Sequence, residues 1–299
     1  MSRVAFLRTS VAPTIAVLTL GGAAAFGAGY PRLGGPLATL LVGMTAWLAW
    51  DARRRLGALA QLQRQGDRVN RAAGAEVQES IRRSERRLFR AGRETVRDVE
   101  ALLQLVPQVA PRALMPPSGF WAMDPRNLAH LVDVVRRRRP RTVLELGGGT
   151  STIWLGYLLE EMGGRLVSVD HDPAFADITR AAVRRHGLAD VVEVRVAPLA
   201  PVEGADADAR WYDASVFSDV VGIELLVIDG PPMASGPRAR SYALPRLASQ
   251  MAPDFAVVLD DAERPDETIA VEEWLDAVPG LERDEVGVSN VAVLRRAAG

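Results

Sequence analysis

The chain lacks two residue types that many enzymes use for chemistry. Its 299 residues include no cysteine, and all 36 basic residues are arginine. The absence of cysteine excludes disulfides, thiol nucleophiles and thiolate metal sites, and the absence of lysine excludes Schiff bases and lysine general bases. The three histidines argue against a zinc centre built from several histidines. The net charge of -1 gives no reason to expect a nucleic-acid partner.

Two runs without any charged residue lie near the N-terminus. No charged residue lies between Arg8 and Arg32, and a second uncharged run extends from Leu33 to Trp50. The first run is long enough to cross a bilayer as a helix, and arginines flank the pair of runs on both outer sides. We therefore predict a transmembrane hairpin over residues 1–50, with both ends in the cytoplasm. One alternative is a single span followed by an interfacial segment. Another is a cleaved signal peptide, and the second apolar run argues against it.

Residues 51–110 contain no proline before Pro107, and apolar residues recur at steps of three and four from Leu56 to Leu102. This spacing predicts a long amphipathic helix, which the prolines from Pro107 onward end. The apolar stripe is narrow, so it fits either a coiled coil, and hence a homo-oligomer, or a helix lying against the membrane. We interpret this segment as a stalk and linker.

Residues 111–299 alternate between helical and extended patterns. Helices are expected over 127–138, 152–161, 174–186, 242–251 and 265–277, and strands over 142–146, 165–169, 191–196, 224–228, 255–259, 281–286 and 290–295. Such alternation predicts an α/β fold, a Rossmann-like doubly wound sheet of seven strands with helices on both faces. The last two strands are separated by only a few residues and must pair antiparallel, so the final strand should be reversed.

The loop after the first strand is the first place to look for a ligand, because ligands of doubly wound sheets lie beyond the carboxyl ends of the strands. There the chain carries Glu145, three glycines (Gly147, Gly148 and Gly149) and Ser151. The third glycine of a dinucleotide-binding loop is missing, which argues against an NAD-type oxidoreductase. Asp170 closes the second strand, where a carboxylate can accept hydrogen bonds from a ribose diol, and His171 follows it.

On these residues, the chain from about Gly119 to the C-terminus resembles the class I S-adenosylmethionine-dependent methyltransferases. The resemblance implies S-adenosyl-L-methionine as the cofactor, bound by the residues just named together with Asp229. Ser151 stands where many members have a third glycine, and Ala197 stands where many have a polar residue near the adenine.

Three further acids follow two later strands. Asp229 ends the fourth strand, and Asp260 and Asp261 end the fifth. Carboxylates gathered at one sheet edge repel each other, and a divalent cation such as Mg²⁺ relieves that repulsion. The arrangement resembles the catechol and caffeoyl-CoA O-methyltransferase branch, whose metal ligands match these positions. The alternative is that Asp260 and Asp261 only cap the loop before the next helix. Without the lysine base of the catechol enzymes, either a metal-bound alkoxide of the acceptor or Asp229 acting as the base would have to suffice.

The sequence thus predicts a membrane-anchored methyltransferase that faces the cytoplasm and methylates a hydroxyl of a small, lipid-linked or otherwise membrane-proximal acceptor. The rival interpretations are a non-catalytic nucleotide-binding scaffold at the membrane and an NAD-type oxidoreductase. Trp211 and Tyr212 lie between the third and fourth strands, where they either line an acceptor pocket or anchor a loop.

Overall fold

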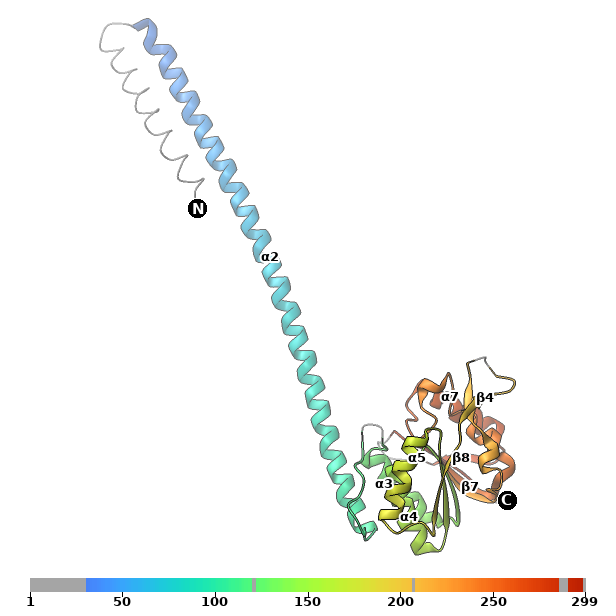
Figure 1. The fold of residues 1–299 in the computed structure, drawn as a ribbon. Helices are drawn as coiled ribbons and strands as arrows, with labels where there is room; N and C mark the ends of the chain where they lie inside the picture. The colour runs from blue at the N-terminus through green and yellow to red at the C-terminus, as the bar shows by residue number, and fades with distance from the viewer. Residues whose placement is uncertain (1–30, 120–121, 206–207, 285–289, 298–299) are drawn as a thin grey trace. The chain divides into compact units, whose positions relative to one another are not determined.

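The chain divides into two compact units, residues 1–88 and 89–299. The computed structural model describes residues 31–119, 122–205, 208–284 and 290–297 (Figure 1). The first unit contains most of one long helix, and the second contains an α/β domain.

The long helix is α2, Pro31–Leu105. The helix predicted from residue 51 is found, and it already begins at Pro31. It ends just before Pro107, which lacks the backbone N–H that helix continuation requires. Along its stripe, seven large apolar side chains are between 52% and 65% exposed: Leu56, Leu59, Leu62, Val69, Val77, Ile81 and Val96. The coiled coil predicted from this stripe stays a prediction.

The predicted membrane hairpin falls largely outside the described residues, because its first span covers residues 11–30. The backbone of its second span, residues 33–50, is helical and forms part of α2. Within the ranges given above, none of the helices has both the length and the apolar character needed to cross a membrane. The anchor is therefore not supported by the structure and stays a prediction.

The domain is built on a seven-stranded sheet with the spatial order β3-β2-β1-β6-β7-β9-β8. In that order, the strands span Val192–Val196, Arg165–Asp170, Thr142–Leu146, Ile223–Ile228, Met251–Leu259, Ala292–Arg296 and Leu281–Asp284. The first five strands are parallel, whereas β9 pairs antiparallel with both β7 and β8. The predicted doubly wound fold with a reversed final strand is confirmed, and the reversed strand lies between β7 and β8.

Helices lie on both sides of this sheet, with α3, α4 and α5 on one side in Figure 1. The helices are α3 (Pro125–Arg138), α4 (Thr150–Met162), α5 (Pro173–Arg185), α6 (Ala243–Leu247) and α7 (Pro265–Ala277). Short 3-10 turns are η1 (Val106–Gln108), η2 (Ala214–Phe217), η3 (Met233–Ser235) and η4 (Ala248–Gln250). The helix predicted over 242–251 is shorter than expected because β7 begins at Met251, which pairs with Ile223 of β6.

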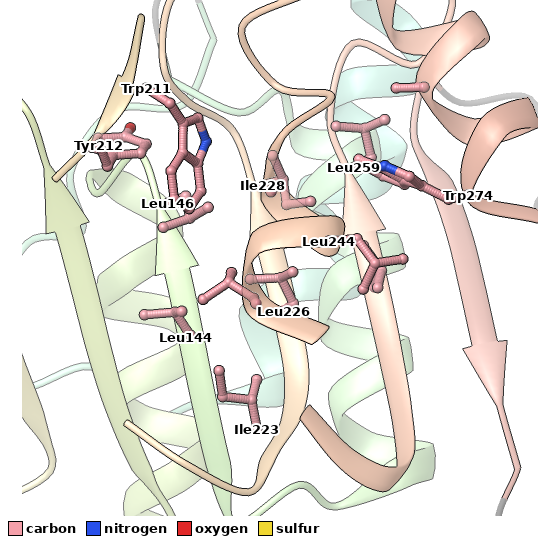
Figure 2. Packing of buried hydrophobic residues seen from close by; sticks show 14 of the residues in the cluster. Leu144, Leu146, Trp211, Tyr212, Ile223, Leu226, Ile228, Leu244, Leu259 and Trp274 are labelled. Carbon is pink, nitrogen blue, oxygen red and sulfur yellow. The ribbon is translucent and has the colours of Figure 1, made fainter. Parts of the chain in front are cut away.

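The core alternates across the sheet with the period of a strand. Val143 of β1 packs with residues of α3 and α4 in one buried cluster, whereas Leu144 and Leu146 belong to a second cluster with α6 and α7. Figure 2 shows this second cluster, in which Leu146 lies beside Trp211. By the same alternation Glu145 shares the face of Val143, so its side chain is directed toward α4.

One element of this second cluster was not predicted. The strands β4 (Leu199–Pro201) and β5 (Arg210–Tyr212) pair antiparallel as a small separate sheet. This hairpin carries Trp211 and Tyr212 to the carboxyl ends of the central strands (Figure 2). It thereby adds aromatic side chains to the edge where the sequence predicts a ligand.

Candidate functional site

The glycine loop between β1 and α4 packs against the loop that follows β6. Gly147 has a φ of +90°, and a Cβ at this position would lie 2.7 Å from the backbone carbon of Asp229. A Cβ at Gly148 would lie 2.4 Å from the Oγ of Ser168. By contrast, a Cβ at Gly149 would meet open space. Packing therefore requires the first two glycines, and the backbone at the third remains accessible next to the start of α4, where helical N–H groups lack intrahelical partners.

Glu145 is fully buried behind this loop and is surrounded by hydroxyls. Its carboxylate accepts hydrogen bonds from Ser151 (2.6 Å), Thr152 (2.5 Å) and Ser168 (2.7 Å). Burial raises the pKa of Glu145, and the three hydroxyls act in the opposite direction. Thr152 Oγ1 also accepts from the N–H of Gly149 at 2.8 Å. Glu145 thus braces the loop from behind, and its predicted contact with the cofactor, like that of Ser151, stays a prediction.

Asp170 stands at the carboxyl end of β2, beside the glycine loop. Its Oδ1 accepts from the N–H of Asp172 at 2.8 Å, and His171 Nδ1 lies 3.2 Å from the same oxygen. The side chain of Asp170 is 11% exposed and that of His171 is 30% exposed. Burial raises the pKa of Asp170. Asp170 therefore keeps an oxygen that is not engaged by these two partners, at the position where a ribose is expected.

Tyr212 brings an unpaired hydroxyl to the same corner. Within the described part of the chain this hydroxyl is buried and has no hydrogen-bond partner. It packs against Gly230, where a Cβ would lie 2.2 Å from the hydroxyl oxygen and 3.1 Å from the Cα of Gly147. Burial, followed by the nearby charge of Asp170, raises the pKa of Tyr212 well above its usual value, so the hydroxyl keeps its proton. A buried polar group without a partner calls for an explanation, and a bound ligand is one.

The structure brings Asp229, Asp260 and Asp261 together, as the sequence predicts. One carboxylate oxygen each from Asp229, Asp260 and Asp261 lies within 4.8 Å of the other two. Burial and the neighbouring Asp260 raise the pKa of Asp229 well above its usual value. Burial and then Asp261 raise the pKa of Asp260 to about 6. The cluster thus concentrates negative charge at the carboxyl ends of β6 and β7.

Each of these carboxylates already has a donor from the chain itself. Asn127 Nδ2 donates to Asp260 Oδ1 at 2.6 Å. Arg240 Nη2 donates to Asp229 Oδ1, and its Nη1 donates to Asp261 Oδ2, both at 3.2 Å. These donors compete with a divalent cation for the oxygens that they contact, and the metal predicted from sequence stays a prediction.

Sequence reasoning missed Arg240 and Asn127. Asn127 lies in the first turn of α3, and Arg240 lies in the irregular segment between η3 and α6. Arg240 belongs to no periodic pattern or recognisable motif. Asn127 lies in a predicted helix, but the acid that it contacts is 133 residues away in the sequence. A polar residue at a position that packing buries is the only signal, and burial is a property of the folded chain.

Residues 144–262 match a family model described as Methyltransferase domain. The matched stretch includes every site residue from Glu145 to Asp261. It supports the class of enzyme that the sequence predicts, a methyltransferase.

Among curated proteins, the chain is 34% identical over 118 residues to a catechol O-methyltransferase of Mycobacterium tuberculosis. The alignment covers 38% of this chain and 52% of that protein, so this chain spans about half the length of the curated relative that it matches.

The solved structures that are similar to this chain include two O-methyltransferases. An O-methyltransferase from Bacillus cereus, in complex with SAH, is 20% identical with a TM-score of 0.46, and the match covers 66% of this chain and 89% of that chain. The O-methyltransferase TomG from Streptomyces achromogenes, in complex with SAM, is 20% identical with a TM-score of 0.44, covering 60% and 82%.

Proposed function

We propose that this chain is an S-adenosylmethionine-dependent methyltransferase that acts on a hydroxyl group. One observation carries the proposal: the open backbone at Gly149, the carboxylate of Asp170 and the unpaired hydroxyl of Tyr212 border one corner at the carboxyl edge of the sheet. The family match over residues 144–262 supports it. When bound, S-adenosylmethionine supplies the methyl group from its sulfonium.

The residues of this corner would each bind a different part of S-adenosylmethionine. Asp170 would accept the hydrogen bonds of the two ribose hydroxyls. The N–H groups at the start of α4, beside Gly149, would bind the carboxylate of the amino-acid tail. The hydroxyl of Tyr212 would donate a hydrogen bond to the ligand, which gives that buried group the partner it lacks in the described part of the chain. Glu145 would act indirectly by holding the loop in shape.

Asp229 is the side chain that we propose as the catalytic base. Its backbone touches the glycine loop at Gly147, and its carboxylate is 14% exposed, so an acceptor hydroxyl next to the cofactor can reach it. Aligning the two reactants contributes most of what methyl transfer needs, and taking up the hydroxyl proton is the remaining task. No step is assigned to a metal, because the three acids already have donors from the chain.

Titration of the full chain with S-adenosylmethionine in a calorimeter tests the proposal. Saturable binding is expected. Asp170→Asn should weaken it about 10- to 100-fold, since hydrogen bonds to a charged group contribute ~1.5–3 kcal/mol. Asp177→Asn is the matched control, because Asp177 is an exposed acid on α5. Heat from NAD⁺ instead would favour the oxidoreductase, and heat from neither compound would contradict the proposed enzyme.

The acceptor is proposed from chemistry and location. A hydroxyl on a small or lipid-linked compound fits Asp229 as base, and the name of the curated relative makes catechol the first probe. Transfer of a labelled methyl group from S-adenosylmethionine to catechol, or to a membrane lipid extract, would identify the class. Incorporation into neither under saturating cofactor would contradict a hydroxyl acceptor of these kinds.

We further propose that residues 1–50 attach the chain to a membrane, with the domain in the cytoplasm, and that the exposed stripe of α2 pairs copies of the chain. The uncharged runs before and after Arg32 and the flanking arginines support the anchor. The apolar side chains exposed along α2 support the pairing. Carbonate extraction of membranes tests the first point, and cross-linking within α2 tests the second.

A further inference from the structure

Arg240 lies inside the acid cluster, with only 6% of its side chain exposed. All three of its guanidinium nitrogens face oxygen atoms. Nη1 donates to the carbonyl of Asp260 at 3.0 Å, and Nη2 donates to the carbonyl of Asp229 at 2.9 Å. Nε donates to the carbonyl of Pro231 at 3.4 Å and lies 3.8 Å from a carboxylate oxygen of Glu267. With the contacts to the carboxylates of Asp229 and Asp261 described above, the guanidinium links the loops that follow β6 and β7.

This set of contacts has the character of a cation site. The partners are carboxylates and backbone carbonyls, the oxygen ligands that hard divalent cations prefer. A guanidinium carries a permanent positive charge, because it cannot be deprotonated in proteins. Its planar fork binds several oxygens at fixed angles, which holds their positions as a coordinated ion would. Arg240 therefore places a positive charge between the three acids, where it offsets their negative charge.

We infer that Arg240 takes the place of a divalent metal in this protein and that it holds Asp229 and Asp261 at the carboxyl edge of the sheet without one. A metal ion bound between the same oxygens would face the positive guanidinium at short range, and it would have to displace that group's hydrogen bonds. The inference concerns how the cluster is assembled, and it rests on the proposed function only for the role of Asp229 as base.

The second arginine near the cluster differs in a way that provides a control. Arg264 contacts Asp261 at 2.8 Å, but its side chain is 41% exposed. It pairs with one acid from the solvent side, whereas Arg240 contacts acids and carbonyls from within. Removing Arg264 takes away the same charge without opening space between the three carboxylates.

Titration of the full-length protein with Mn²⁺, followed by electron paramagnetic resonance, tests the inference. The wild type and Arg264→Met should show no saturable binding at millimolar Mn²⁺. Arg240→Met, which keeps an apolar stem and removes the charge, should bind Mn²⁺ saturably, and the additional change Asp261→Asn should weaken that binding at least tenfold. Saturable binding by the wild type that Asp261→Asn abolishes would overturn the inference. Absence of binding in a folded Arg240→Met variant would also overturn it, because the acids would then not form a cation site.

The variant can depend on a cation for folding, so its circular dichroism is recorded with and without Mn²⁺ or millimolar guanidinium. An Arg240→Met chain that folds only when either cation is added supports the inference. One that stays unfolded with both contradicts it, since a replacement cation should restore the cluster. None of these measurements involves S-adenosylmethionine. The inference about Arg240 can therefore fail while the cofactor binds, and cofactor binding can fail while the inference about Arg240 holds.

Discussion

The charge cluster around Asp260 makes a quantitative prediction about stability and pH. Asp260 is 5% exposed, and its pKa rises from 3.8 to about 6 because of burial and the neighbouring Asp261. A shift of about two units corresponds to about 3 kcal/mol of folding free energy.

The raised pKa of Asp260 determines whether stability rises or falls with pH. A carboxyl whose pKa is raised in the folded state binds its proton more tightly there, so its protonation stabilises the fold. That stabilisation is fully present below the pKa of the unfolded chain, near 3.8, and it is lost as the pH rises through about 6. At neutral pH the ionised Asp260 therefore lowers the free energy of unfolding relative to a neutral side chain of the same shape.

The substitution Asp260→Asn removes the charge and keeps an oxygen that can accept from Asn127. At about pH 7.5 the variant should be more stable than the wild type, by at most about 3 kcal/mol, and at about pH 4 the two should converge. Urea unfolding followed by tryptophan fluorescence reports on the domain, because Trp211 and Trp274 are buried in it. The difference between the two chains isolates Asp260 from the other acids.

Asp254→Asn provides the control, because Asp254 lies on the same strand with 60% of its side chain exposed. This variant should show no comparable gain in stability at neutral pH. The reasoning would be refuted if Asp260→Asn were less stable than the wild type at about pH 7.5 and kept the same dependence of stability on pH. In that case the ionised carboxylate would be stabilised by its neighbours, and burial would not dominate its pKa.

Two further predictions follow from close contacts at the corner. Gly148→Ala places a Cβ 2.4 Å from Ser168 Oγ, so it should cost about 1–3 kcal/mol of stability. Adding Ser168→Ala removes that oxygen, so the double variant should be more stable than the sum of the single effects; strict additivity in urea unfolding would contradict this contact. Tyr212→Phe removes an unpaired buried hydroxyl, so it should raise the melting temperature of the ligand-free chain and weaken S-adenosylmethionine binding about tenfold. Unchanged affinity in calorimetry would remove Tyr212 from the cofactor site.

The sequence determined the architecture of the domain because local periodicity specifies elements and because parallel strands bring their carboxyl ends to one edge. The strand 142–146 and the helix 265–277 have the bounds expected from their patterns. The convergence of Asp229, Asp260 and Asp261 followed from the same rule, since the acids directly follow the ends of β6 and β7. The short helix α6 was overestimated, because the pairing of Met251 with Ile223 is a tertiary contact that local pattern cannot reveal.

Only the tertiary structure decided what each acid faces. Glu145 and Asp170 both lie at or near the end of a strand, so the sequence does not distinguish them. In the structure, Glu145 is buried behind the glycine loop and accepts from three hydroxyls, whereas the side chain of Asp170 stays partly exposed to solvent. Arg240 enters the acid cluster from an irregular segment, where no period marks an inward position. Short-range patterns specify where strands and helices lie along the sequence, whereas the neighbours of a buried charge come from separate segments and are fixed only when those segments pack together.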